Sequence, residues 1–441
     1  MTPKTARTIM LKVLALGYRK QVKTKRRSRC RAEKPAVLKI KQFKETVESR
    51  GVLMVGFFGP EQKELVQMMY GSASEDYLLL LESLGDFFEK EIEPTARQID
   101  LKAEFPRENI RKLFEQGFTS MGFPKDFGGL ELPWPIYIAA MEMCGKACAS
   151  TALSLAIHGT CCEGIRQFSN PSQKREYLPQ MISGKKFAGF SLTEPGAGSD
   201  ARNLQTTARP EGGQWVVNGT KMFTTNGGYC DLYFLFAKTP KGPSAFLIDA
   251  KSAKSSKHID KLGYRGSVTA EVVFENAHVP KESLVGTEGQ GFEYAKKMLY
   301  GGRVTVGAIS TGIARAAFDK AVKYSKDRTA FGKPLSDFEM IQSKLADMLT
   351  DINASRMMVY RAARLKDQGR PFESEAAQAK VFASEHGLRV CDEAIQIHGG
   401  YGYADEFDVH RHWRDSRLNT VGEGTSEIMR LIIAKHIIKG S

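Results

Sequence analysis

The most constraining feature of this chain is the stretch of residues 190–200, which reads Phe-Ser-Leu-Thr-Glu-Pro-Gly-Ala-Gly-Ser-Asp. Its apolar start is typical of a strand, and the strand then passes into a loop. Pro195 restricts the backbone, whereas Gly196 and Gly198 let it approach a flat or anionic group. The Thr193 hydroxyl can donate a hydrogen bond to a ring heteroatom or a phosphate oxygen. A surface turn also uses such residues, but eleven in this order exceed what a turn requires.

The basic charge of the chain is confined to its beginning. The 441 residues carry a net charge of +14, and residues 1–53 hold 16 Lys or Arg against 3 Asp or Glu. The remainder is therefore nearly neutral, which argues against a nucleic-acid-binding body. The histidines form no H-E-x-x-H pattern and the cysteines no C-x-x-C pair, so no metal site is predicted.

Residues 1–58 are predicted to be a basic extension that is disordered or outside the fold. Three interpretations stay open: a mitochondrial transit peptide, a basic arm, and an over-extended start with Met54 as the initiator. The first would place the protein in the mitochondrial matrix, and the other two in the cytoplasm. No apolar run approaches the roughly 20 residues that a membrane-spanning helix requires.

Three domains are expected after the extension. Residues 59–185 and 289–441 show helical apolar spacing, whereas residues 186–288 read as short strands bounded by Gly, Pro or Asn. Within the strands, Asn218-Gly219 predicts a tight hairpin turn between residues 215–217 and 220–223. The glycines at 286, 289 and 291 have the wrong spacing and surroundings for a dinucleotide fingerprint and are expected to lie in a loop. The fold class is mainly α with a β middle domain.

Five motifs in this order resemble those of the acyl-CoA dehydrogenase family, and the resemblance covers roughly residues 74 to 440. They are residues 190–200, Lys221–Gly227 (KMFTTNG), Lys261–Ser267 (KLGYRGS), Arg328–Lys333 (RTAFGK), and a C-terminal set that runs from Gln396 (QIHGGYG) through WRD to GEGTSE. The resemblance implies an N-terminal helical domain, a central β-barrel-like domain and a C-terminal four-helix bundle. It further implies FAD as cofactor, a homo-oligomer that in this family is usually a tetramer, and electron-transferring flavoprotein as partner.

The family's cofactor contacts can be carried over onto matching positions of this sequence. Arg328 and Phe331 match residues that reach the FAD of a neighbouring subunit, and Gln396, Gly399 and Gly400 match the segment under its adenosine half. The Thr225 hydroxyl is expected near the flavin N5 edge. The cofactor-binding residues predicted in this way are Phe190, Leu192, Thr193, Ser199, Phe223, Thr225, Arg328, Phe331, Gln396, Gly399, Gly400, Thr425 and Glu427.

The reaction that the resemblance implies removes an α-proton from an acyl-CoA while a β-hydride moves to the flavin, which yields the trans-2-enoyl-CoA. Family members place the catalytic glutamate at one of two positions, which here are Glu423 and Gly302. Because glycine cannot act as a base, Glu423 is the predicted catalytic residue. Glu194, in the first motif, is expected to be structural. Ser199, Arg303, Gly422 and Gly424 are the predicted substrate-binding residues.

Departures from the family pattern bear on the substrate. Gly422 stands where many members carry an aromatic residue, and Gly301-Gly302 remove further bulk, which suggests room for a branched or cyclic acyl group beside short and medium chains. Residues 150–159 lack the arginine that anchors the distal carboxylate in glutaryl-CoA members, which argues against a dicarboxylic acyl group.

Other functions on the same fold stay open at this point. A flavin oxidase or monooxygenase commonly lacks the glutamate, so Glu423 argues against it. A DNA-associated flavoprotein of the alkylation-response branch is supported only by the basic extension. Catalysis in the opposite direction, as an enoyl-CoA reductase, fits the same motifs.

Overall fold

The structure is a computed structural model that describes residues 57–256 and 258–439. The predictions for residues 1–56 lie outside these ranges. The chain divides into two compact units between Asp86 and Phe87. In the described part of the first unit, Gly85 packs against the backbone of Phe58, where a methyl group would lie 3.2 Å from the Phe58 nitrogen.

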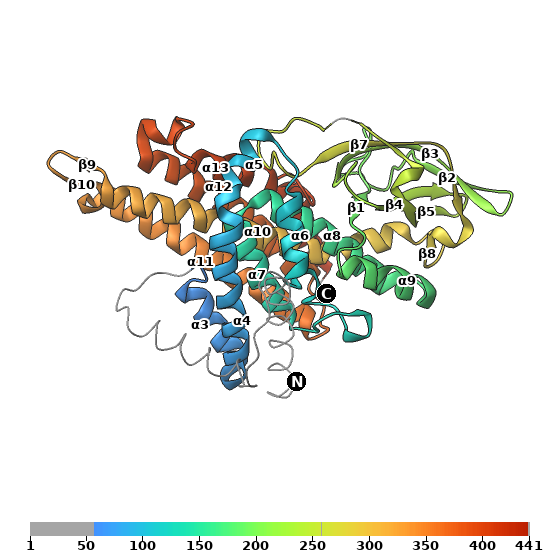
Figure 1. The fold of residues 1–441 in the computed structure, drawn as a ribbon, viewed down its shortest axis with the longest axis horizontal. Coiled ribbons are helices and arrows are strands. Elements are labelled where there is room, and N and C mark those ends of the chain that lie inside the picture. Colours follow the sequence, from blue (N-terminus) through green and yellow to red (C-terminus); the bar gives the residue numbers. More distant parts are fainter. Residues whose placement is uncertain (1–56, 257, 440–441) are drawn as a thin grey trace, which may run out of the picture. The chain divides into compact units, whose positions relative to one another are not determined.

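Most described residues are helical (Figure 1). The helices are α3 (Pro60–Tyr70), α4 (Ser74–Phe87), α5 (Glu93–Lys102), α6 (Arg107–Glu115), α7 (Trp134–Ala147), α8 (Ala149–Phe168), α9 (Pro171–Ile182), α10 (Gly291–Asp327), α11 (Glu339–Asp367), α12 (Glu373–His398), α13 (Val409–Asn419) and α14 (Ser426–Lys439). Local capping defines several of their ends. Asn170 forms a capping box with Gln173 at the start of α9, and the Thr425 hydroxyl accepts the Ile428 amide at the start of α14.

The strands lie between α9 and α10, apart from one small hairpin. They are β1 (Ala188–Ser191), β2 (Thr207–Glu211), β3 (Gln214–Thr225), β4 (Leu232–Thr239), β5 (Gly242–Asp249), β6 (Lys254–Ser255), β7 (Thr269–Pro280), β8 (Leu284–Val285), β9 (Thr329–Ala330) and β10 (Lys333–Pro334). The main sheet has the order β6-β7-β3-β2-β4-β5-β8, and β1 pairs in parallel with β4. The predicted fold class, helical with a β middle domain, is confirmed.

The hairpin predicted at Asn218-Gly219 is wrong, because β3 runs through both residues as one strand. The reversal occurs instead at Gly212 and Gly213, whose φ values are +56° and +80°. Gly219 lies at a register shift between β3 and β7, and a methyl group on it would stand 2.5 Å from the Thr206 hydroxyl oxygen. Close approach and a positive φ therefore explain this glycine, and the Asn-Gly pair marks a bulge rather than a turn.

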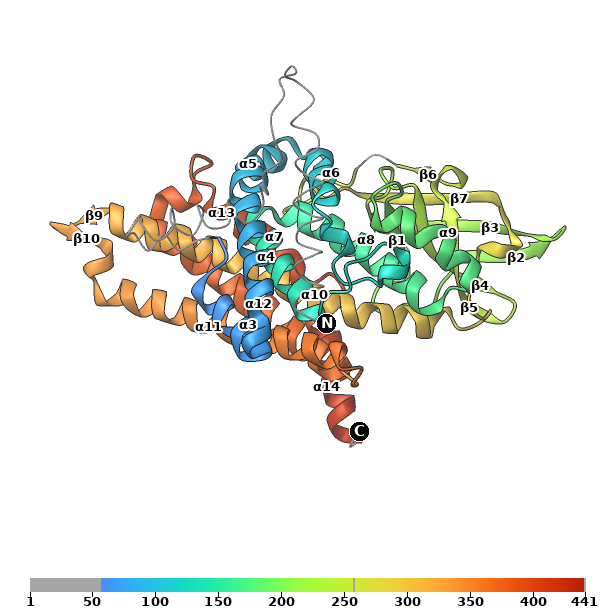
Figure 2. The same cartoon turned by 60° about the horizontal axis from the view of Figure 1, so that its bottom comes forward.

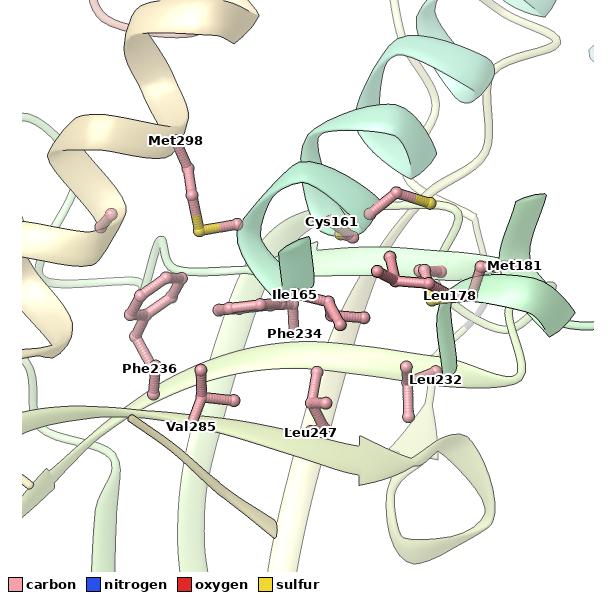
Figure 3. Packing of buried hydrophobic residues seen from close by; sticks show 14 of the residues in the cluster. Cys161, Ile165, Leu178, Met181, Leu232, Phe234, Phe236, Leu247, Val285 and Met298 are labelled. Atoms are coloured by element: carbon pink, nitrogen blue, oxygen red, sulfur yellow. The ribbon is translucent and has the colours of Figure 1, made fainter. Parts of the chain in front are cut away.

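A shared apolar core joins the sheet to the helices. Cys161 and Ile165 of α8 and Met298 of α10 belong to one buried cluster with Phe234 of β4 (Figure 3). Leu192 is part of the same cluster. Gly164 is required here, since a methyl group would lie 2.4 Å from the Met298 methyl carbon. This core fixes the loop after β1 relative to α8 and α10, the helices that carry the candidate site.

The β9–β10 hairpin lies at the opposite end of the helices from the main sheet, as Figures 1 and 2 both show. It follows α10 directly, and α10 extends unbroken from Gly291 to Asp327. At about 1.5 Å per helical residue, Arg328 stands about 40 Å along this helix from Gly302.

Candidate active site

Glu423 lies in a tight loop between α13 and α14. Its φ is +55° and that of Gly424 is +95°, a left-handed conformation that is strained for a glutamate. The loop is held because the Leu418 carbonyl accepts the amides of Val421 and Gly422, both at 2.8 Å. Lys380 of α12 adds a bond from its ammonium group to the Gly424 carbonyl at 2.6 Å. Such strain, maintained by surrounding contacts, is typical of a functional site.

The buried Glu423 carboxylate lacks some of the hydrogen bonds that would stabilise its negative charge. Its Oε2 atom is shielded from water and has no hydrogen-bond partner among the described residues. Burial raises the pKa of Glu423, and the positive charges of Arg303 and Lys380 oppose that rise. Burial in turn lowers the pKa of Lys380 to about 8. A carboxylate left unsatisfied in this way is a stronger proton acceptor than a solvated one.

Arg303 borders the same carboxylate from α10. Its Nε atom donates to the Glu423 carbonyl oxygen at 3.4 Å, while its Nη1 atom is buried without a partner among the described residues. An unsatisfied guanidinium donor beside an unsatisfied carboxylate oxygen indicates a space made for a polar group that is not part of the chain.

Gly302 is the second position at which the family places a base, and it lies directly against Glu423. A methyl group on Gly302 would stand 2.8 Å from the Glu423 Oε2 atom. The two positions are 121 residues apart in the sequence, yet they converge on one point. Glycine in mid-helix costs about 1 kcal/mol relative to alanine, and the room that it leaves for Glu423 is the packing reason for it.

A cavity of about 230 Å³ begins on this face of α10. Gly302 and Met298 line it from α10, Thr160 from α8 and Trp134 from α7. Its volume is below the 300–1,000 Å³ typical of small-molecule sites. Any group that this cavity holds would therefore be small.

The glycine-hinged loop of residues 190–200 is anchored from within. The buried Glu194 carboxylate accepts the amides of Gln205 at 2.6 Å and Thr206 at 3.0 Å, and it accepts the Lys221 ammonium at 2.7 Å. The Thr193 carbonyl accepts the Met222 amide at 2.8 Å, which ties the loop to β3. Gly196 has no neighbouring atom where its side chain would be. The loop is thus rigid at its base and open at its tip.

Phe223 and Thr225 lie beside this loop on β3. Phe223 has a φ of +54° and is 60 % exposed, and it falls in a register shift between β3 and β7. A strained, exposed aromatic ring next to an open glycine loop fits the flat ring of a flavin. Phe190, in contrast, packs on the apolar cluster.

The other predicted cofactor residues fall into a second group. Phe331 is 96 % exposed on the β9–β10 hairpin with a φ of +48°, and Arg328 lies over the Tyr401 ring at 5.8 Å. Gln396 and Gly399 are exposed at the end of α12. The length of α10 separates Arg328 from Glu423, so one chain does not bring the two groups together. Thr425 and Glu427 follow Glu423 directly at the start of α14.

Three participants lie outside the assignments made from the sequence. Lys380 has no local motif around it, and only the packing of α12 against the Glu423 loop identifies it. Lys221 and Asn226 belong to the second motif but received no role. The Asn226 amide nitrogen donates to the carbonyls of Ser154 and Ala188, both at 3.0 Å, and so joins β1 to α8.

This arrangement fits one class of protein, a flavin-dependent oxidoreductase: an exposed aromatic ring adjoins an open glycine loop, and a buried carboxylate adjoins Gly302, which lines a small cavity. Three family models match the chain, namely the N-terminal domain of acyl-CoA dehydrogenase at residues 74–185, its middle domain at 189–277 and its C-terminal domain at 289–438. The chain belongs to the acyl-CoA dehydrogenase family. It is therefore an oxidoreductase, and FAD is the cofactor of its family.

Relatives and solved structures agree with this assignment. The human mitochondrial short-chain specific acyl-CoA dehydrogenase is 42 % identical over 373 residues, which cover 83 % of this chain and 90 % of the relative. The butyryl-CoA dehydrogenase of Megasphaera elsdenii matches with a TM-score of 0.81 and 39 % identity over 82 % of this chain and 98 % of its own. A structure on the electron-transferring flavoprotein of Acidaminococcus fermentans and flavin-based electron bifurcation contains a chain with a TM-score of 0.81 and 39 % identity, over 83 % and 98 %. Among the described helices, none is long and apolar enough to cross a membrane.

Proposed function

We propose that this chain dehydrogenates a short acyl-CoA to the trans-2-enoyl-CoA, with Glu423 as the base. The observation that carries the proposal is the shielded, unpartnered Oε2 atom of Glu423 at the glycine-lined start of the acyl cavity. A reaction that takes a proton from a carbon atom needs such a carboxylate, desolvated and fixed in position.

The chain's own residues would divide the work as follows. The Glu423 carboxylate accepts the α-proton of the thioester, and its raised pKa makes it a stronger acceptor. Lys380 and Arg303 hold the loop that presents it. FAD, when bound, supplies the acceptor for the β-hydride, while Phe223 and the Thr225 hydroxyl orient its ring.

The cofactor site would be completed by a second copy of the chain. Arg328 and Phe331 are exposed about 40 Å along α10 from Gly302, and a planar guanidinium suits a pyrophosphate. This separation supports a homo-oligomer, for which a tetramer is typical of the family. Electron-transferring flavoprotein is the proposed electron acceptor, in keeping with the similarity to a chain from a structure on that partner.

The proposal is tested by mixing purified holoprotein anaerobically with butyryl-CoA and with longer, branched and cyclic acyl-CoAs while recording the flavin spectrum. We expect rapid bleaching that is strongest with a short acyl group. In a parallel aerobic assay, oxygen consumption without an added acceptor would instead support an oxidase. A flavin that no acyl-CoA bleaches would refute the dehydrogenase assignment.

A further inference from the structure

The cavity that Gly302 lines also carries charges that the proposed reaction does not use. Glu163 and Arg166 of α8 line it together with Lys366 at the end of α11. We propose that these three residues form a recognition site for an acyl group that ends in a carboxylate. The inference rests on the proposed function and names its substrate class.

Glu163 is already fully satisfied within this group. Its carboxylate accepts Arg166 through Nε at 2.7 Å and through Nη2 at 2.8 Å, and it accepts the Gln167 amide at 2.6 Å. Although burial alone would raise it, the neighbouring Lys366 and Arg166 charges and these hydrogen bonds hold the pKa of Glu163 at about 2. Glu163 is therefore an anion flanked by two cations, Lys366 and Arg166, which leaves one positive charge over.

Lys366 is the cation in excess. Its ammonium group lies 3.4 Å from Glu163 Oε1, an oxygen that already accepts two shorter bonds, and 3.7 Å from the centre of the Trp134 ring. Asp367, which also lines the cavity, accepts the Trp134 amide and the Arg364 guanidinium, each at 3.0 Å. If Arg364 neutralises Asp367, then Glu163, Arg166 and Lys366 together keep a formal net charge of +1. An entering carboxylate would neutralise it.

The glycine pair connects this charge to the base. A methyl group on Gly301 would lie 3.5 Å from the Lys366 Nζ atom, as one on Gly302 would lie 2.8 Å from Glu423 Oε2. Because consecutive Cα atoms are about 3.8 Å apart, the base and the ammonium group face the same short segment of α10. An acyl chain of a few carbon atoms could therefore place its α-carbon at Glu423 and its far end near Lys366.

A methyl end would be disfavoured beside these charges. It would lie against a buried ammonium group without offering it a hydrogen-bond acceptor, and such mismatches discriminate more strongly than apolar contacts do. Residues 150–159 carry no arginine that could bind a distal carboxylate. The structure brings cations from elsewhere, Arg166 from the end of α8 and Lys366 from α11.

The test compares how tightly the oxidised holoprotein binds matched reaction products, measured by calorimetry. The probes are trans-2-enoyl-CoA esters of five to eight carbon atoms that end either in a methyl group or in a carboxylate. We expect at least one carboxylate-ended ester to bind about tenfold more tightly than the methyl-ended ester of equal length, since 1.4 kcal/mol corresponds to that ratio.

Two variants are expected to change the preference for a carboxylate end in opposite directions. They therefore distinguish recognition of the carboxylate from a purely structural role of these residues. Lys366→Met should abolish the preference for the carboxylate, whereas Glu163→Gln should increase it by removing the competing anion. Lys344→Met is the control, because it makes the same change on the same helix at a part-exposed pair with Glu393. FAD content and melting temperature of each variant show whether it folds, and either variant alone suffices for the test.

Several outcomes would overturn the inference. A parent protein that binds methyl-ended esters more tightly at every length would do so, as would an unchanged preference in folded Lys366→Met. If neither kind of ester binds and no acyl-CoA bleaches the flavin, the proposed function itself fails. If the protein oxidises butyryl-CoA but shows no preference between carboxylate-ended and methyl-ended esters, the proposed function stands and only the carboxylate site is refuted.

Discussion

Two glutamates that the chain withdraws from water have opposite surroundings. Glu194, at the base of the glycine-hinged loop, accepts two backbone amides and the buried Lys221 ammonium. Glu423, in the loop before α14, keeps one oxygen with no partner among the described residues. The Lys221 charge and the hydrogen bonds outweigh burial and lower the pKa of Glu194, whereas burial outweighs Arg303 and Lys380 and raises that of Glu423.

The difference shows how one residue type serves structure in one place and chemistry in another. A satisfied carboxylate fixes backbone and has little tendency to take up a proton. An unsatisfied one is poorly stabilised as an anion and is therefore a better proton acceptor. On this argument, Glu194 supports the loop that faces the cofactor and Glu423 takes part in the reaction.

The largest effect is expected for Glu423→Gln. The amide keeps the shape of the side chain but cannot accept the α-proton, so kcat should fall by at least about 10³-fold, within the range for loss of a general base. Stopped-flow flavin reduction would measure this, with FAD content and enoyl-CoA affinity as controls expected to stay near the parent values. Near-normal turnover would exclude Glu423 as the base.

Glu194→Gln should affect stability instead. It leaves the Lys221 ammonium buried beside a neutral amide, and loss of one partner of a buried ion pair costs about 3–5 kcal/mol. Denaturant unfolding of the holoprotein would measure the loss. Glu275→Gln is the matched control, since its pair with Lys254 is exposed and screened by solvent, so its loss should leave stability nearly unchanged. A variant that is fully stable yet inactive would reverse the roles assigned to the two glutamates.

Gly302→Ala tests the space that Glu423 requires. The added methyl group would stand 2.8 Å from Oε2 and displace the carboxylate, and a misplacement of about 1 Å can reduce kcat by about 10²-fold. Gly301→Ala, the neighbouring control, would place its methyl at an ordinary 3.5 Å from Lys366 and should leave kcat with butyryl-CoA largely unchanged. Equal losses in both variants would point to a general effect on α10.

The smallest effect should be a difference in how the two glutamates couple stability to pH. The folded pKa of Glu194 lies below its unfolded value of about 4.3, so its contribution is present above that pH and is lost on acidification. The folded pKa of Glu423 lies above the same unfolded value, so its ionisation destabilises the fold as pH rises from about 4.3 through the folded pKa. Glu194→Gln should therefore lose melting temperature relative to the parent as pH rises from acid up to about 4.3, whereas Glu423→Gln should gain it as pH rises above about 4.3. Slopes of the same sign would contradict the comparison.

The sequence by itself determined the order of helical, β and helical segments, the family, and Glu423 as the candidate base. These depend on local signals: apolar periodicity, glycines where φ is positive, and short motifs with set spacing. The same locality explains the error at Asn218-Gly219, because the pair has the composition of a turn, and only the neighbouring Thr206 and strand β7 show that it is a bulge.

Only the tertiary structure decided which distant groups meet at the site. Gly302 touches Glu423 across 121 residues, Lys380 reaches the Gly424 carbonyl from another helix, and Lys366 faces the cavity that Glu163 lines. No local pattern encodes these contacts, since each depends on how helices pack. The charge that a carboxylate carries follows from that packing, because burial and the cations around it set its pKa.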